Sequence, residues 1–355
     1  IGIMKNVAGQ SPDDDDRDRN HERPGRAEHA GGLARRDAES ILHSAEDVAS
    51  VLRFFPVAVL LSDSNYQIAC STCLARSASY FYFMAEWFDS VLHLNLDDAW
   101  ESAALAFPNR DLRHWGPRLR FSAPAREIEH FYSEQENGLP PFLIYGSGDF
   151  HHLTALWLRR LAGLTTVVSF DNHPDWDIRP PRWACGSWVN RALALPQIEK
   201  LTVWGCGNFE CWWPRRIFGN NRAERLGRLA VHPWADDRTV RERGRRGAIL
   251  RGNWREKFAA FVEQLGRAKV YLTIDLDCLR RQDAITNWES GRFTTEDVAW
   301  AIELLGGGSR IVGGDICGAW SRPAYARRKQ RFASEMDHPK LPKQDPEVVR
   351  QINMI

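Results

Sequence analysis

The stretch "TTVVSFDNHPDWD" (165–177) joins a β-branched apolar run to a loop dense in acidic and imidazole side chains. The run 165–170 is typical of a buried strand, and Asp171, His173 and Asp175 follow it on alternate residues. In an extended chain, alternate side chains project to the same side. Two carboxylates and an imidazole on one side suit a divalent cation, which supplies the counter-charge that crowded carboxylates need. A polar loop with an Asx turn is the alternative that this stretch alone leaves open.

Similar apolar runs recur along the chain, with helical patterns between some of them. The runs predict strands at 141–146, 165–170, 200–205, 227–233, 269–274 and 309–314. The helical patterns fall at 152–163, 254–266 and 294–305. Short apolar runs separated by helices imply βαβ units and a mainly parallel sheet that is covered on both faces. Ligand sites in such α/β sheets form outside the carboxyl ends of the strands.

Two other strand ends carry side chains of the same chemistry. "YLTIDLDCL" (271–279) places Asp275 and Asp277 directly after an apolar run, and "YGSGDFHHLTALWL" (145–158) places two histidines where a strand turns into a helix. Each stretch taken alone is also explained by solvated strand ends or helix caps. Together the three strand ends favour a pair of metal ions. The ligand set is rich in carboxylates and has no thiolate, which favours Mn²⁺ over a structural Zn²⁺.

From about residue 140 to 320, the motifs resemble those of the arginase/agmatinase/formiminoglutamase family of ureohydrolases. The Gly-Gly-Asp-His turn of that family is similar to "GSGDFHH" (146–152), and its Asp-x-His-x-Asp motif is similar to "DNHPD" (171–175). Its Ser-x-Asp-x-Asp motif resembles "TIDLD" (273–277), and its last Gly-x-Asp motif resembles "VGGDICG" (312–318). The resemblance implies a three-layer αβα fold around a parallel sheet of about eight strands, with two Mn²⁺ ions and a bridging hydroxide.

Carried over residue by residue, the resemblance implies six metal ligands. One inserted residue, Phe150, separates Asp149 from the first histidine, so His152 stays open as the alternative to His151. The implied activity is hydrolysis of a carbon–nitrogen bond in a linear guanidino or amidino substrate. The implied ligands are His151, Asp171, His173, Asp175, Asp275 and Asp277.

The chain departs from the family at residues that act on the substrate. "ACGSWVNRAL" (184–193) has Cys185 where the family has the histidine that shuttles protons; a buried small apolar residue is the alternative interpretation of this cysteine. Gly318 stands three residues after Asp315, where the family has the glutamate that binds the guanidinium group. Glu289, in "TNWESG" (286–291), is the candidate to replace that carboxylate. The residues expected to act in catalysis are Asp175, Cys185, Glu289 and Asp315.

Three alternatives follow from these departures. The substrate is either a small arginine-like compound or an arginine within a peptide. A zinc-dependent amide deacetylase of the same fold is the rival enzyme, although six ligand candidates speak against a single Zn²⁺. A metal-binding homologue that has lost catalysis is the third alternative, which the missing histidine and glutamate both permit.

The composition of the chain indicates its partners, its cellular compartment and its domain organisation. The chain has 355 residues and a net charge of +1, so its overall charge favours neither nucleic acid nor a membrane surface as a partner. Seven cysteines without disulfide spacing point to a reducing cytoplasm. The sequence leaves open whether the protein forms a homo-oligomer. The expected organisation is a disordered segment at 1–48, an arginase-like domain at 49–322 and a basic, Pro-rich surface extension at 323–355.

Overall fold

The structure, a computed structural model, describes residues 90–101, 105, 107–181 and 183–353. The segment 1–48 and residues 49–89 of the expected domain lie outside these residues. The described strands form one sheet of eight in the order β2-β1-β3-β8-β7-β4-β5-β6, and all neighbours are parallel. The strands are β1 (Val91–Asn95), β2 (Asn109–Asp111), β3 (Phe142–Tyr145), β4 (Thr165–Phe170), β5 (Ile198–Cys206), β6 (Leu229–Pro233), β7 (Lys269–Asp275) and β8 (Arg310–Cys317).

The helices are mostly short. Two longer ones, α9 and α10, pack side by side. In α9, Trp254, Phe258 and Phe261 are buried at helical spacing, and α10 begins where Thr294 accepts a hydrogen bond from the Asp297 backbone N–H. The helices are α3 (Gly116–Leu119), α4 (Ala125–Gln135), α5 (Thr154–Trp157), α6 (Trp188–Ala192), α7 (Asn221–Arg225), α8 (Val240–Arg243), α9 (Trp254–Leu265), α10 (Thr295–Gly308), α11 (Arg328–Asp337) and α12 (Pro346–Asn353).

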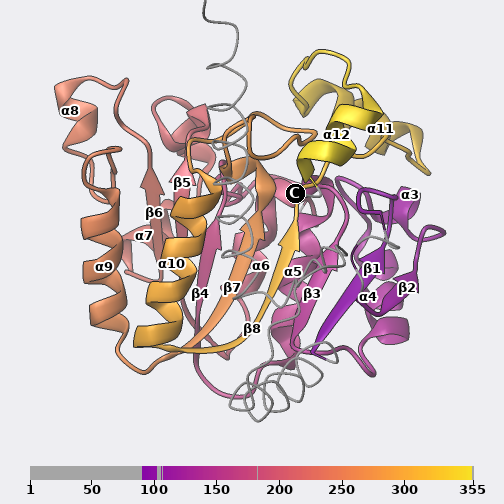
Figure 1. Ribbon diagram of the computed structural model, residues 1–355, viewed down its shortest axis with the longest axis horizontal. Coiled ribbons are helices and arrows are strands. Elements are labelled where there is room, and N and C mark those ends of the chain that lie inside the picture. Colours follow the sequence, from indigo (N-terminus) through magenta and orange to yellow (C-terminus); the bar gives the residue numbers. More distant parts are fainter. Residues whose placement is uncertain (1–89, 102–104, 106, 182, 354–355) are drawn as a thin grey trace, which may run out of the picture. The chain divides into compact units, whose positions relative to one another are not determined.

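Helices cover both faces of the sheet (Figure 1), and alternate strand residues feed two separate cores. One core combines Leu143, Val167 and Tyr271 of the sheet with Phe131, Trp157 and Trp188 of α4, α5 and α6. The other combines Val168, Val270 and Leu272 with Phe258, Val262 and Ile302 of α9 and α10. This is the three-layer αβα fold that the sequence predicts. Among the described residues, no helix has the length and apolar character needed to cross a membrane.

Agreement with the sequence is closest at the strands that lead to the candidate ligands. The run 165–170 coincides with β4, and the run 269–274 lies within β7. The helix expected at 152–163 is present over 152–160, but it is not a single α-helix. The chain there forms a 3₁₀ turn over Gly148–Leu153, then α5, then a second 3₁₀ turn over Leu158–Arg160. Every side chain of the first turn from position 149 to 153 is buried, so the turn has no solvent face of the kind an amphipathic helix presents.

The stretch expected as a surface extension, 323–355, contains two helices, α11 and α12, of which α11 packs on the domain. Gln330 and Ser334 of α11 are buried, and the Gln330 amide donates hydrogen bonds to the backbone oxygens of Arg120 and Pro117. Both helices lie at the end of the sheet toward which the arrows of β7 and β8 point (Figure 1). The C-terminal segment therefore covers the sheet edge where the candidate ligands emerge.

Candidate metal centre

The six expected ligands meet at one edge of the sheet. The ends of β4 and β7 are neighbours, because Phe170 pairs with Ile274. The 3₁₀ turn Gly148–Leu153 contacts β8, which lies between β3 and β7, and brings a histidine to the same place. The side chains that converge there are His151, Asp171, His173, Asp175, Asp275 and Asp277.

Five of these side chains form two overlapping groups, and Asp275 belongs to a third group with His151 and Cys317. Ligand atoms of His151, Asp171 and Asp175 lie within 4.8 Å of one another, and those of Asp171, His173 and Asp277 do the same. Asp171 belongs to both groups. Its Oδ2 atom and the Nδ1 atom of His151 are buried and form no hydrogen bond. Buried polar atoms without a partner are rare and costly, so this donor set fits divalent cations that would accept these lone pairs. Of the two histidines left open by the sequence, His151 is in the groups found among the described residues and His152 is not.

The hydrogen bonds of His151 fix which ring nitrogen faces the carboxylates. Its Nδ1 atom lies 3.2 Å from Oδ2 of both Asp171 and Asp175. Its Nε2 atom lies 3.0 Å from the hydroxyl of Thr273, which in turn donates to Asp315 Oδ1 at 2.7 Å. Because the Thr273 hydrogen is directed at Asp315, the hydroxyl oxygen accepts from His151 Nε2–H. Nδ1 is then free for a metal ion, as in carboxylate–histidine–metal arrangements.

His173 is held in a similar way from the other group. Its Nδ1 atom lies 2.8 Å from Asp277 Oδ2, and its Nε2 atom lies 3.3 Å from Glu289 Oε2. The backbone oxygen of Glu289 also accepts a hydrogen bond from the Asn172 side chain. Glu289 therefore reaches the site, where its nearest side-chain partner is the candidate ligand His173, which it orients.

Asp175 has an unusual backbone. Its φ of 45° lies in the left-handed region, which few residues other than glycine adopt. The indole N–H of Trp188 donates to Asp175 Oδ2 at 2.7 Å, and the Val189 N–H donates to the Asp175 backbone oxygen. These contacts stabilise a conformation that turns the Asp175 carboxylate toward His151.

Charge is crowded at the centre, and the pKa values reflect it. Burial and the neighbouring Asp171 raise the pKa of Asp175 to about 7, and burial raises the pKa of Asp277 to about 6. Burial and Asp277 raise the pKa of Asp275 well above its ordinary value. Burial alone would lower the pKa of His151, but Asp171 and Asp175 raise it well above the ordinary range. The metal-free site therefore retains protons that metal ions would displace.

Metal-free protein is expected to become less stable as pH rises from about 4 to 8. Between its unfolded and folded pKa values, Asp175 holds a proton in the folded state that the unfolded chain has released, and Asp277 does the same. Each such proton lowers the free energy of unfolding by about 1.4 kcal/mol per pH unit. Metal ions compete with these protons, so the stabilisation by Mn²⁺ should grow with pH. Melting temperatures measured with Mn²⁺ and with EDTA from pH 5 to 8 check this; a constant difference between the two would contradict it.

A small cavity of about 50 Å³ opens onto the centre. Its floor includes Asp171, Asp175, Asp275 and Asp277. Cys185 and Glu289 also line it, but Asp315 does not. Asp315 lies behind His151, where it accepts hydrogen bonds from Tyr145, Thr154, Tyr271 and Thr273. Asp315 is thus placed to position His151 through Thr273, away from the cavity.

The structure favours the interpretation of Cys185 as a buried small residue. Its side chain is buried, and this burial raises the pKa of the thiol well above its ordinary value. A thiol that stays protonated at neutral pH is a poor proton acceptor. Cys185 therefore forms part of the cavity wall, and we assign it no proton transfer.

Gly318 occupies a place that no side chain fits. Its φ is 107°, and a Cβ atom there would lie 2.2 Å from Asp275 Oδ1 and 2.5 Å from the Leu276 backbone nitrogen. The preceding residue, Cys317, places its thiol 3.5 Å from Asp275 Oδ2 and forms a third group with His151 and Asp275. Sequence reasoning missed Cys317, although its place two residues after Asp315 on a buried strand points it at the same edge.

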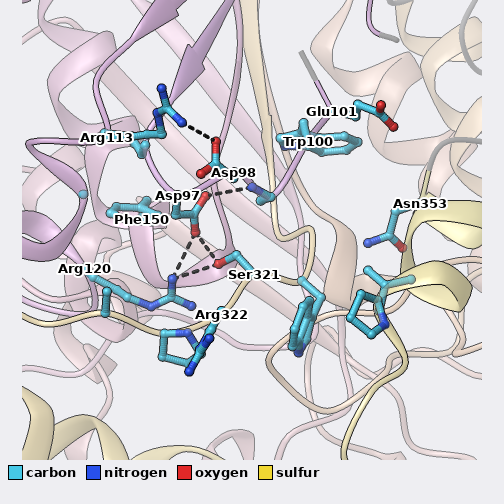
Figure 2. A pocket seen from close by; sticks show the side chains of 18 of the residues that line it. Asp97, Asp98, Trp100, Glu101, Arg113, Arg120, Phe150, Ser321, Arg322 and Asn353 are labelled. Atoms are coloured by element: carbon cyan, nitrogen blue, oxygen red, sulfur yellow. Dashed lines mark hydrogen bonds and ion pairs between the residues drawn. The ribbon is translucent and has the colours of Figure 1, made fainter. Parts of the chain in front are cut away.

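A buried arginine supports the turn that carries His151. The guanidinium group of Arg120 donates to Asp149 Oδ2 at 2.6 Å and to Ser321 Oγ at 2.8 Å, and lies 3.0 Å from Asp97 Oδ2. Figure 2 shows Arg120, Asp97 and Ser321 joined at the wall of a larger cavity of about 780 Å³. Asp149 is two residues before His151, so this network fixes the position of the first ligand.

The C-terminal segment contributes a second partner to Asp149. His338, directly after α11, places its Nε2 atom 2.8 Å from Asp149 Oδ1. Its ring stacks on Trp288, with the two centroids 4.2 Å apart. Trp288 lines the cavity next to Glu289. The sequence contained no local signal for this contact, since the three residues come from distant parts of the chain.

Comparisons with known proteins give likenesses at low identity. No family model matches the chain. An uncharacterized protein of Thermotoga maritima is 30% identical over 189 residues, which are 52% of this chain and 62% of that protein. This chain thus spans less than two thirds of that relative's length.

Solved structures similar to this chain include an arginase from Medicago truncatula, at 16% identity and a TM-score of 0.38, covering 71% of this chain and 91% of that one. Formimidoylglutamase from Bacillus subtilis has 14% identity and a TM-score of 0.43, covering 65% and 78%. Proclavaminate amidino hydrolase from Streptomyces clavuligerus has 13% identity and a TM-score of 0.43, covering 75% and 92%. The present chain is arginase-like in the motifs quoted above and in its fold, an all-parallel sheet of eight described strands, and it is divergent in sequence.

Proposed function

We propose that this chain is a metal-dependent hydrolase that cleaves a carbon–nitrogen bond of a guanidino or amidino substrate, using two Mn²⁺ ions. The observation that carries the proposal is the pair of ligand groups that share Asp171 at the floor of one cavity. Both groups are rich in carboxylate oxygen and each has one imidazole nitrogen, a combination that suits Mn²⁺. Two adjacent ligand groups suit two ions, which is the arrangement of many hydrolases.

The side chains of the centre would have different roles in the reaction: some bind the metal ions and one transfers a proton. Metal ions bound at the floor supply Lewis acidity that lowers the pKa of a water molecule from about 15.7 toward neutrality. His151 and His173 stay neutral and direct Nδ1 at the metal ions, because Thr273 and Glu289 occupy their Nε2 atoms. Asp175 takes up the proton of the attacking water and passes it to the leaving amine. The water oxygen bonds to the amidino carbon as the carbon–nitrogen bond breaks, which gives urea or an amide and an amine.

The rival function is a zinc-dependent deacetylase with one ion. Such a site would need only one of the two ligand groups. The second group, Asp171, His173 and Asp277, is as compact as the first and is held by Glu289 from outside. This argues for two ions. A cytoplasmic location remains a prediction from cysteine usage.

Purified protein loaded with Mn²⁺ is expected to release urea or ammonia from at least one member of a panel of alkylguanidines, guanidino acids and arginine-containing peptides. Acetylated amines belong in the same panel as deacetylase substrates. His173→Asn should abolish turnover by removing one ligand group. The matched control is Glu335→Gln, which changes an exposed residue of α11 that pairs with Arg331. This variant should keep full activity. Tight binding of a single Zn²⁺ that Mn²⁺ does not replace, together with deacetylation, would overturn the proposal.

A further inference from the structure

Three carboxylates surround the mouth of the cavity above the metal floor. Glu210 follows β5, Glu289 lies in the loop after β7, and Asp337 ends α11. All three line the cavity, and we call them the carboxylate rim. Asp337 is held in place by its neighbour His338, which is fixed between Asp149 and Trp288. The rim is therefore built from three separate elements and includes the C-terminal segment.

Bound metal ions would neutralise the carboxylates of the floor but not those of the rim. The floor contributes four carboxylates, Asp171, Asp175, Asp275 and Asp277. Two divalent cations balance these four negative charges. Asp171 Oδ2 and His151 Nδ1, which lie 3.2 Å apart without a hydrogen bond, fit such ions. The rim carboxylates remain unbalanced after the floor is filled. A ligand that enters above the metal ions therefore meets a negative field.

The positive side chains nearest the rim, His338 and Arg179, are each paired with a carboxylate outside it, Asp149 and Asp177. Among the described residues that line the cavity there is no Lys or Arg. Arg179 lies close enough to influence Glu210 and Asp337, but its guanidinium group is bound to both carboxylate oxygens of Asp177. Burial and repulsion between Glu210 and Asp337 raise the pKa of Glu210. His173, which bonds Glu289, is directed at the floor through Nδ1.

Aromatic rings complete the mouth. Trp288 lines the cavity next to Glu289, and Phe209, which is 54% exposed, lies next to Glu210. Aromatic faces attract cations in addition to the carboxylates. The cavity of about 50 Å³ has room for one small polar group, so the rest of a substrate would leave past Phe209.

We propose that the carboxylate rim selects the substrate: it takes a molecule that carries a positive charge and rejects one that carries a carboxylate near the scissile group. Glu210 and Asp337 are the specificity-determining residues, and α11 is part of the active site. This inference rests on the proposed function, because it assigns the rim to the substrate of the metal centre. An arginine held in a peptide satisfies it, since its own carboxylate is in an amide bond, and so does an alkylguanidine.

Binding to the Mn²⁺-loaded protein, measured by calorimetry, tests the rim without any need for turnover. We expect butylguanidinium to bind more tightly than its uncharged analogue butylurea and more tightly than 4-guanidinobutanoate. Asp337→Asn and Glu210→Gln should each weaken butylguanidinium binding about threefold to tenfold, because each removes one charge-assisted contact. Neither variant should change butylurea binding or metal content. Glu335→Gln, on the same helix as Asp337, should bind like the parent.

The outcomes separate this inference from the proposed function. Rim-dependent binding of butylguanidinium without hydrolysis of any guanidino compound would refute the proposed function and support the rim. Hydrolysis with unchanged binding and an unchanged KM in Asp337→Asn and Glu210→Gln would refute the rim and support the function. Equal binding of butylguanidinium and 4-guanidinobutanoate, or no binding of butylguanidinium by the parent, would also refute the rim.

Discussion

Replacing Asp171 with alanine is expected to remove both metal ions and more than about 99% of the activity. Asp171 is the residue that the two ligand groups have in common, and its Oδ2 atom is buried without a hydrogen-bond partner. Each ion would therefore lose a charged ligand at once. Changes that only disturb the surroundings of a metal ligand cost about 10–100-fold in affinity or activity, so the loss of a shared ligand should exceed that. Elemental analysis after gel filtration gives the metal content directly.

Single-group variants provide the comparison. Asp175→Asn weakens the group with His151, and His173→Asn weakens the other, so each should leave about one ion per chain. Asp111→Asn changes an exposed carboxylate and should leave two. If Asp171→Ala retains one ion with unchanged affinity, the two groups do not share this residue as the structure indicates.

Replacing Arg120 with methionine is expected to lower the free energy of unfolding by about 3–5 kcal/mol, the usual cost of leaving buried charges unpaired. The Arg120 side chain is 1% exposed and contacts two carboxylates, those of Asp149 and Asp97, which are 0% and 8% exposed. Methionine fills much of the space but satisfies neither carboxylate. Urea denaturation monitored by tryptophan fluorescence measures the change.

Three further variants test whether the unpaired buried carboxylates cause this loss of stability. Arg120→Lys keeps the charge but loses the fork that reaches Asp149 and Ser321 together, so it should lose less stability than Arg120→Met. Arg113→Met removes an exposed arginine of the cavity that Arg120 also lines, and it should leave the midpoint of urea denaturation nearly unchanged. Asp149→Asn combined with Arg120→Met should recover part of the loss. Stability within about 1 kcal/mol of the parent for Arg120→Met would show that the buried pairs contribute little.

Local patterns in the sequence predicted six of the eight described strands and the meeting of the candidate ligands at one sheet edge, whereas β1 and β2 were not predicted. The β-branched run 165–170 is β4, since a strand buried on both faces needs a continuous apolar run. The alternation of Asp171, His173 and Asp275, Asp277 after apolar runs led to the same sheet edge because parallel strands share one carboxyl end. These signals come from residues that are adjacent in the sequence, so they can be recognised before the structure is known.

Contacts between distant segments could not be predicted in this way. Arg120, His338 and Asp337 lie far from the motifs in the sequence, and nothing in their local patterns distinguishes them from surface residues. Their roles come from the packing of α11 and of the loop before α4 against the turn that carries Asp149. The change of helix type within 148–160 was not predicted, because the residues Gly148–Leu153 are all buried and no solvent face marks where the 3₁₀ turn passes into α5.

The conformation of Gly318 closes this position to every side chain. A β-carbon there would lie 2.2 Å from Asp275 Oδ1 and 2.5 Å from the Leu276 backbone nitrogen, so any substitution, glutamate included, would displace a candidate metal ligand. A redesign that aims to place a carboxylate at residue 318 would therefore have to rebuild the backbone after β8 first, and carboxylates that reach the cavity from other loops are the positions open to engineering.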